Sequence, residues 1–178
     1  MLWAAVVGRA LGLLLMAALG WQILGRELDF SSTTGPLRFI HGIDLVIHEA
    51  GHAFAIFLPR FLHVLGGSAL QVLMPAVCAW TFLKQRQPGS FAVALFWTGE
   101  SVTDVAIYMA DAKRRALPLL GGDPTGHDWH YLLGQLGLLN WGQALGRLTF
   151  GLGISMIAIA LGILVNESYQ AWQRASRA

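Results

Sequence analysis

The chain has few charged residues and almost no cysteine. Asp, Glu, Lys and Arg make up 12% of its 178 residues, whereas they make up about a quarter of an average soluble domain. The single cysteine, Cys78, allows no internal disulfide and no cysteine-rich zinc site. The net charge of +2 is small and scattered along the chain. We therefore expect neither a disulfide-stapled domain nor a protein that binds nucleic acid.

Apolar residues form long runs and account for 55% of the chain. Because about 20 apolar residues cross the hydrocarbon core of a bilayer, five runs are candidates for entering the membrane: 2–24, 36–59, 61–83, 91–112 and 146–165. The first is favoured as an anchor helix over a signal peptide, since it lacks a preceding basic run and a clear cleavage site. A polar linker (25–35), a Pro/Gly loop (116–127) and a short amphipathic helix (128–139) separate these runs. The sequence predicts one all-α integral membrane domain over 1–178, with four or five membrane segments in contact with lipid.

The second run contains His48-Glu49-Ala50-Gly51-His52, which reads HExxH. Residues four apart lie on the same face of a helix, so both imidazoles can bind one zinc ion. Glu49 lies about 100° further round, where its carboxylate can take a proton from a water whose pKa zinc lowers to about 7. Ionisable residues inside a membrane are costly unless they line a site. The pattern predicts zinc held by His48 and His52, with Glu49 as the general base.

A third zinc ligand is expected, because catalytic zinc usually takes three protein ligands and keeps one position open. In the fourth run, four polar residues share one helical face: Glu100, Asp104, Tyr108 and Asp111. Alternating spans would make the second and fourth helices parallel and would bring Glu100 to the depth of the histidines. Glu100 is therefore the first choice as third ligand. Alternatively, these acids pair with Arg9 or Arg147.

Two carboxylates are candidates for orienting the ligand histidines. Asp104 lies one turn after Glu100, and Asp44 lies one turn before His48. Each could accept a hydrogen bond from an imidazole N–H, which fixes the ring and raises its basicity.

A second set of polar residues follows the fourth run: Asp111, His127, Asp128 and His130. Asp111 or His127 could complete the zinc site in place of Glu100, with Asp128 bonding a far ring nitrogen. Alternatively, His127 or His130 could stabilise the oxyanion that forms during hydrolysis. A structural alternative is an interfacial turn in which Asp128 caps the following helix.

The third run begins with Gly66-Gly67-Ser68, followed by Gln71. A break in the helix there would expose backbone amides near the zinc, and a substrate strand could pair with them. Gly67, Ser68 and Gln71 are the candidate substrate-binding residues. Alternatively, the glycines serve close helix packing.

HExxH together with the ExxxD pattern of Glu100 and Asp104 resembles the gluzincins, the thermolysin-like and CAAX prenyl protease families. In those families the Glu is the third ligand and the Asp orients a ligand histidine. In a small multi-span chain, HExxH most resembles the site-2 protease class of intramembrane metalloproteases. This resemblance implies zinc-dependent hydrolysis of a peptide or membrane protein. That class usually takes its third ligand from an Asn-Pro…Asp-Gly segment, which this chain lacks.

The stretch from Ala110 to Trp129 looks like small uncharacterised bacterial membrane proteins with HExxH, so we expect a location in the bacterial inner membrane. Two other functions stay open. One is a metal transporter or sensor in which the histidines and the acids of the fourth run form a transit site. The other is a scaffold that retains a protease-like site without activity.

Overall fold

The computed structural model describes residues 2–26, 28, 34–119 and 126–178, and every regular element in these ranges is helical. The predicted all-α fold is therefore confirmed. Much of the predicted 25–35 linker and the middle of the predicted 116–127 loop lie outside the described residues. The elements, in chain order, are α1 (Leu2–Leu24), α2 (Gly35–Phe54), α3 (Arg60–Lys84), α4 (Pro88–Asp111), α5 (Asp128–Gln135), the 3-10 turn η2 (Leu139–Trp141) and α6 (Gly142–Ser176).

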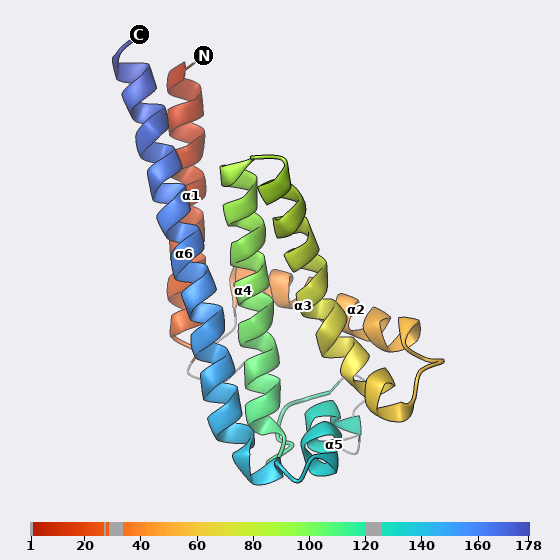
Figure 1. The fold of residues 1–178 in the computed structure, drawn as a ribbon. Coiled ribbons are helices and arrows are strands. Elements are labelled where there is room, and N and C mark those ends of the chain that lie inside the picture. Colours follow the sequence, from red (N-terminus) through yellow and green to blue (C-terminus); the bar gives the residue numbers. More distant parts are fainter. Residues whose placement is uncertain (1, 27, 29–33, 120–125) are drawn as a thin grey trace.

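Four of the helices form an elongated bundle, and α2 lies across it (Figure 1). α4 packs between α6 and α3, and α1 packs along α6 with both chain termini at the same end. α2 packs chiefly on α3 rather than alongside α4. The prediction that the second and fourth helices are parallel is therefore wrong. α5 lies at the opposite end from the termini, against α3 and α4.

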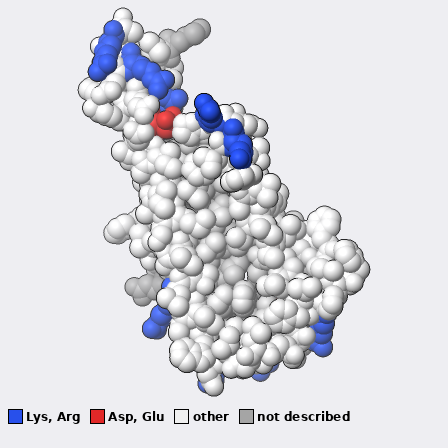
Figure 2. Space-filling model, in the orientation of Figure 1, with Lys and Arg blue, Asp and Glu red and all other residues white. Residues whose placement is uncertain are grey.

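Three helical segments are long and apolar enough to cross a membrane: Leu2–Leu24, Arg60–Lys84 and Leu139–Ser176. This is fewer than the four or five membrane segments predicted. Among the described residues, α2 and α4 do not meet the same criterion, and these two helices carry most of the buried acidic and histidine side chains. Figure 2 shows Lys and Arg gathered toward the two ends of the molecule, with a broad uncharged band between them on this face. A protein that spans a bilayer has this distribution of charge.

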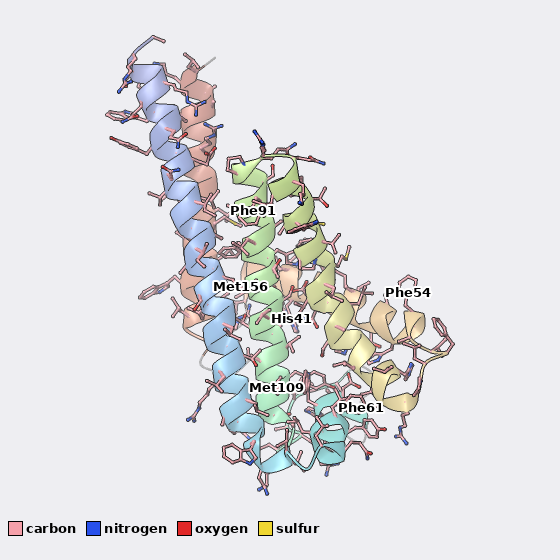
Figure 3. All side chains as sticks on the ribbon, viewed as in Figure 1. His41, Phe54, Phe61, Phe91, Met109 and Met156 are labelled. Atoms are coloured by element: carbon pink, nitrogen blue, oxygen red, sulfur yellow. The ribbon has the colours of Figure 1, made fainter. Side chains whose placement is uncertain are left out.

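The turn between α2 and α3 is apolar and exposed. Phe54, at the end of α2, points away from the bundle (Figure 3) and is 72% exposed. Ile56 and Phe57 follow in the turn, at 72% and 81% exposure. In contrast, the buried cluster that joins α1, α2, α4 and α6 lies at the centre of the bundle and contains Leu19, Ile23, Leu37, Phe96, Ile157 and Ala160.

Glycines bring the backbones of α2 and α3 into direct contact. A Cβ added at Gly51 would lie 2.2 Å from the carbonyl oxygen of Gly66, and one added at Gly66 would lie 2.7 Å from the carbonyl oxygen of Gly51. No side chain fits between the helices at this crossing. α3 runs unbroken through residues 66–68, so the predicted break, with its exposed amides, does not occur. The close-packing alternative describes this segment.

Gly51→Ala should therefore destabilise the fold, because the new methyl group would meet the main chain of α3. Overpacking of this kind costs about 1–3 kcal/mol or more. The matched control is Gly42→Ala in the same helix, where an added Cβ meets nothing within 4 Å. The control should be neutral or stabilising by up to about 1 kcal/mol, since Ala favours helix over Gly. Thermal unfolding in detergent measures both, and equal melting temperatures for the two variants would contradict the crossing.

Candidate metal centre

Three ligand-type side chains converge where α5 meets α2. His48 and His52 lie one turn apart on α2, and Asp128 is the first residue of α5. The Oδ2 atom of Asp128 lies 2.9 Å from His48 Nε2 and 3.2 Å from His52 Nε2. One ligand atom from each residue lies within 4.8 Å of the other two. The predicted histidine pair is thus brought together with a carboxylate.

The hydrogen bonds of the two imidazoles determine which nitrogen faces this point. His52 Nδ1 lies 3.0 Å from the main-chain carbonyl oxygen of His63, which can only accept, so Nδ1 carries the proton. His48 Nδ1 lies 3.0 Å from the side-chain oxygen of Gln71 and donates in the same way. In the neutral rings, each Nε2 therefore presents a lone pair to Asp128. These outer partners fix the ring orientation as they do at known metal sites.

With both rings neutral, three acceptor atoms point at one another, so a cation has to lie between them: either a proton that makes one imidazole a donor to Asp128, or a metal ion. The hydrogen bond with Asp128 raises the pKa of His52 accordingly. The Asp128 side chain is largely buried. Its burial alone would raise the pKa of the carboxyl, but the hydrogen bonds with His48 and His52 outweigh burial and lower that pKa below its ordinary value. The carboxylate is therefore ionised at neutral pH. Two imidazole nitrogens and one carboxylate oxygen are a donor set that zinc accepts, leaving a fourth position for water. The residues present fit a zinc ion.

Gly67 lies directly against both rings. A Cβ added there would lie 2.6 Å from His48 Nε2 and 2.6 Å from His52 Nε2. Any larger residue at this position would push the ligand nitrogens away from each other or from Asp128. Because it has no side chain, Gly67 leaves the space in which these two ring nitrogens lie. Its neighbour Ser68 accepts a hydrogen bond from the Trp129 indole at 3.1 Å, which ties α3 to α5.

A cavity of about 560 Å³ opens at the three ligands. Glu49 and Tyr108 lie on its wall beside them. Glu49 is exposed, and no hydrogen bond or ion pair joins its carboxylate to another described residue, so it can act on a bound water. Aliphatic side chains and a proline line much of the remaining wall: Leu45, Val64, Val105, Leu117, Pro118 and Leu119.

Glu100 does not lie with the histidines but belongs to a second, buried cluster. Arg26 pairs with Glu100 at 2.9 Å and also with Asp104. Asp104 in turn contacts His41 Nδ1 at 2.6 Å, and His41 lies where α2 passes α4 (Figure 3). The structure therefore pairs Glu100, the first choice as third ligand, with an arginine, and it brings Asp128 to the two histidines instead. The pairing of these acids with an arginine was an alternative from the sequence, although the partner is Arg26 rather than Arg9 or Arg147.

Asp44 also belongs to this second cluster rather than orienting His48. It accepts hydrogen bonds from the Trp97 indole at 2.8 Å and from the Ser101 hydroxyl at 3.2 Å. The N–H of His48 that Asp44 was expected to accept is bound by Gln71 instead. Gln71, predicted to bind substrate, both lines the cavity and orients a ligand.

His127 and His130 are used to hold α5 in place. His127 Nδ1 accepts the main-chain N–H of His130 at 3.2 Å, and its Nε2 faces Asp111 at 3.3 Å. Burial lowers the pKa of His127, although Asp111 opposes this change. His130 Nδ1 donates to the carbonyl oxygen of Ala112 at 2.8 Å. Asp111 accepts two main-chain N–H groups just beyond α4. None of the three residues is among those lining the cavity.

Sequence reasoning placed Asp128 beside a histidine but missed its direct approach to both of them. Asp128 lies 80 residues after His48 in the chain, so no local spacing indicated this contact. Comparison with family models, with curated proteins and with solved structures finds no match for this chain. The case for a metal centre therefore rests on the geometry.

The choice between Asp128 and Glu100 as third ligand can be tested by metal content. Asp128→Asn should lose zinc, because the amide cannot supply the ionised oxygen. Glu100→Gln should retain about one zinc per chain, because Glu100 lies with Arg26 and not with the two histidines. Mass spectrometry of the metal in detergent-purified protein, after zinc repletion, distinguishes them. Zinc lost from the Glu100 variant and kept in the Asp128 variant would refute this assignment.

Gly67→Ala should weaken zinc binding without unfolding the chain, because its methyl group would meet the ligand nitrogens. We expect a ~10- to 100-fold loss of affinity, as for other changes that displace ligand rings. Competition with a zinc chelator measures it. Gly134→Ala in α5, where an added Cβ meets nothing within 4 Å, is the control. Wild-type affinity in the Gly67 variant would show that the rings do not need this space.

Proposed function

We propose that this chain is a zinc-dependent peptidase that acts at or within the membrane. His48, His52 and Asp128 are the ligands, and Glu49 is the general base. The observation that carries the proposal is the convergence of three acceptor atoms with Nδ1 of both imidazoles already bonded elsewhere. A proton on one imidazole and a zinc ion are the two cations that this geometry accepts, and the metal content of the purified protein separates them.

The chemistry follows from the residues around the cavity. When bound, a zinc ion makes water acidic enough to ionise at neutral pH and polarises the carbonyl group to be cleaved. Glu49 takes the proton of the water as the water oxygen bonds to the carbonyl carbon and the C=O electron pair moves to the carbonyl oxygen. Glu49 then gives that proton to the leaving nitrogen as the C–N bond breaks. The two steps use one water and produce a carboxyl and an amine.

The substrate we propose is an apolar peptide or a segment of a membrane protein. Aliphatic residues line much of the cavity, and three helical segments of the chain are able to cross a bilayer. A cavity of about 560 Å³ holds a few residues of an extended peptide rather than a folded domain. Together with the HExxH resemblance to the site-2 protease class, these features favour an inner-membrane enzyme over a soluble one. The apolar turn after α2 would add a contact with lipid.

Glu49→Gln tests the proposal, because it removes the base and keeps the side-chain shape. Cleavage of internally quenched apolar peptides in detergent micelles should fall by at least ~100-fold, in line with the loss of a general base. Zinc content should stay at the wild-type level, since Glu49 is not a ligand. Two results together would favour a transporter. The wild-type protein would bind zinc but cleave none of the peptides. Wild type and the Glu49→Gln variant would also carry zinc across vesicle membranes equally well.

A further inference from the structure

Tyr108 occupies a position on the cavity wall that the proposed reaction has not used. It lies on α4, and its ring meets that of His48 edge-on with centroids 5.9 Å apart. On its other side the ring lies 4.3 Å from that of His127. Two aromatic contacts therefore hold the ring between a ligand and a residue that fixes α5. The side chain is positioned before any substrate binds.

The hydroxyl oxygen of Tyr108 accepts a hydrogen bond, and among the described residues its proton has no acceptor. Its oxygen accepts the main-chain N–H of Asp128 at 3.0 Å. No described residue accepts the hydroxyl proton of Tyr108. A tyrosine hydroxyl has one proton to donate, and this one lies beside a ligand residue on the wall of the cavity. The proton can therefore be given to a group that enters the cavity.

We propose that Tyr108 donates a hydrogen bond to the carbonyl oxygen of the scissile peptide as that oxygen gains negative charge. This inference rests on the proposed peptidase function and adds a catalytic residue to it. As the water oxygen bonds to the carbonyl carbon, the C=O electron pair moves to the oxygen that faces Tyr108. The tyrosine keeps its proton throughout, and the hydrogen bond strengthens as charge builds up. A donor fixed in advance stabilises the transition state more than the substrate.

The same hydroxyl has a second connection, since it bonds the main chain of a metal ligand. Its removal could therefore act through Asp128 rather than through the substrate. These two roles differ in what they change. A catalytic donor affects the turnover number and leaves zinc affinity intact, whereas a residue that only positions Asp128 affects zinc affinity first.

The test is Tyr108→Phe, which keeps the ring and its packing and removes only the hydroxyl. The control is Tyr131→Phe on α5, whose ring packs on Arg60 outside the cavity. We expect kcat of the Tyr108 variant to fall ~100-fold, as when one oxyanion donor is removed, with KM and zinc affinity near wild type. A phosphinic analogue of the best-cleaved peptide, whose tetrahedral oxygens imitate the charged state, should bind more weakly by a similar factor.

Three results would overturn the inference. One is wild-type kcat in Tyr108→Phe, and another is unchanged affinity for the phosphinic peptide. The third is a loss of activity that disappears when excess zinc restores full occupancy, which would make Tyr108 a positioning residue. Failure of the proposed function is a separate result. In that case wild type and Tyr131→Phe would themselves show no zinc-dependent cleavage, and the role given to Tyr108 would fall with it.

Discussion

The candidate metal centre depends on the close crossing of α2 and α3. Because Gly51 and Gly66 leave only backbone between the two helices, α3 comes near enough to place Gln71 and the carbonyl oxygen of His63 behind the imidazoles. Gly67 then leaves room for the ligand nitrogens in front. The same glycines that allow the helices to pack therefore also set the orientation of the rings. A substitution at one of these glycines would therefore change both the packing of the helices and the orientation of the imidazoles.

The described part of the chain contains two groups of acidic and histidine side chains. The two groups differ in where the positive charge beside their carboxylates comes from. Around Asp104 and Glu100, the guanidinium of Arg26 supplies a positive charge from the protein itself. Around Asp128, no lysine or arginine among the described residues takes that place. There the positive charge comes either from a proton on one imidazole or from a metal ion, because a buried carboxylate needs a cation beside it. The first group therefore ties the end of α1 to α4, and the second is suited to take its cation from outside.

The helices and the histidine pair could be predicted from the sequence because they depend on local pattern. Runs of apolar residues predict α1, α3 and α6, and the spacing of His48 and His52 places them on one face. Which carboxylate lies beside the histidines depends on the angle between α2 and α4. That angle cannot be predicted from the periodicity of the sequence. Glu100 would lie at the depth of the histidines only if the two helices were parallel, and α2 instead packs chiefly on α3. Asp128 begins α5, and the placement of that helix depends on contacts with Asp111 and Ser68.

The two ligand histidines are oriented by partners of different kinds. His52 donates to a main-chain oxygen, which every amino acid at position 63 provides. His48 donates to a side-chain oxygen, which Gln71 supplies and most other residues would not. The orientation of the His52 ring thus depends on the path of the backbone, whereas that of the His48 ring depends on one side chain. If the proposed metal binds, position 71 is where a substitution would alter its affinity while His48, His52 and Asp128 stay unchanged.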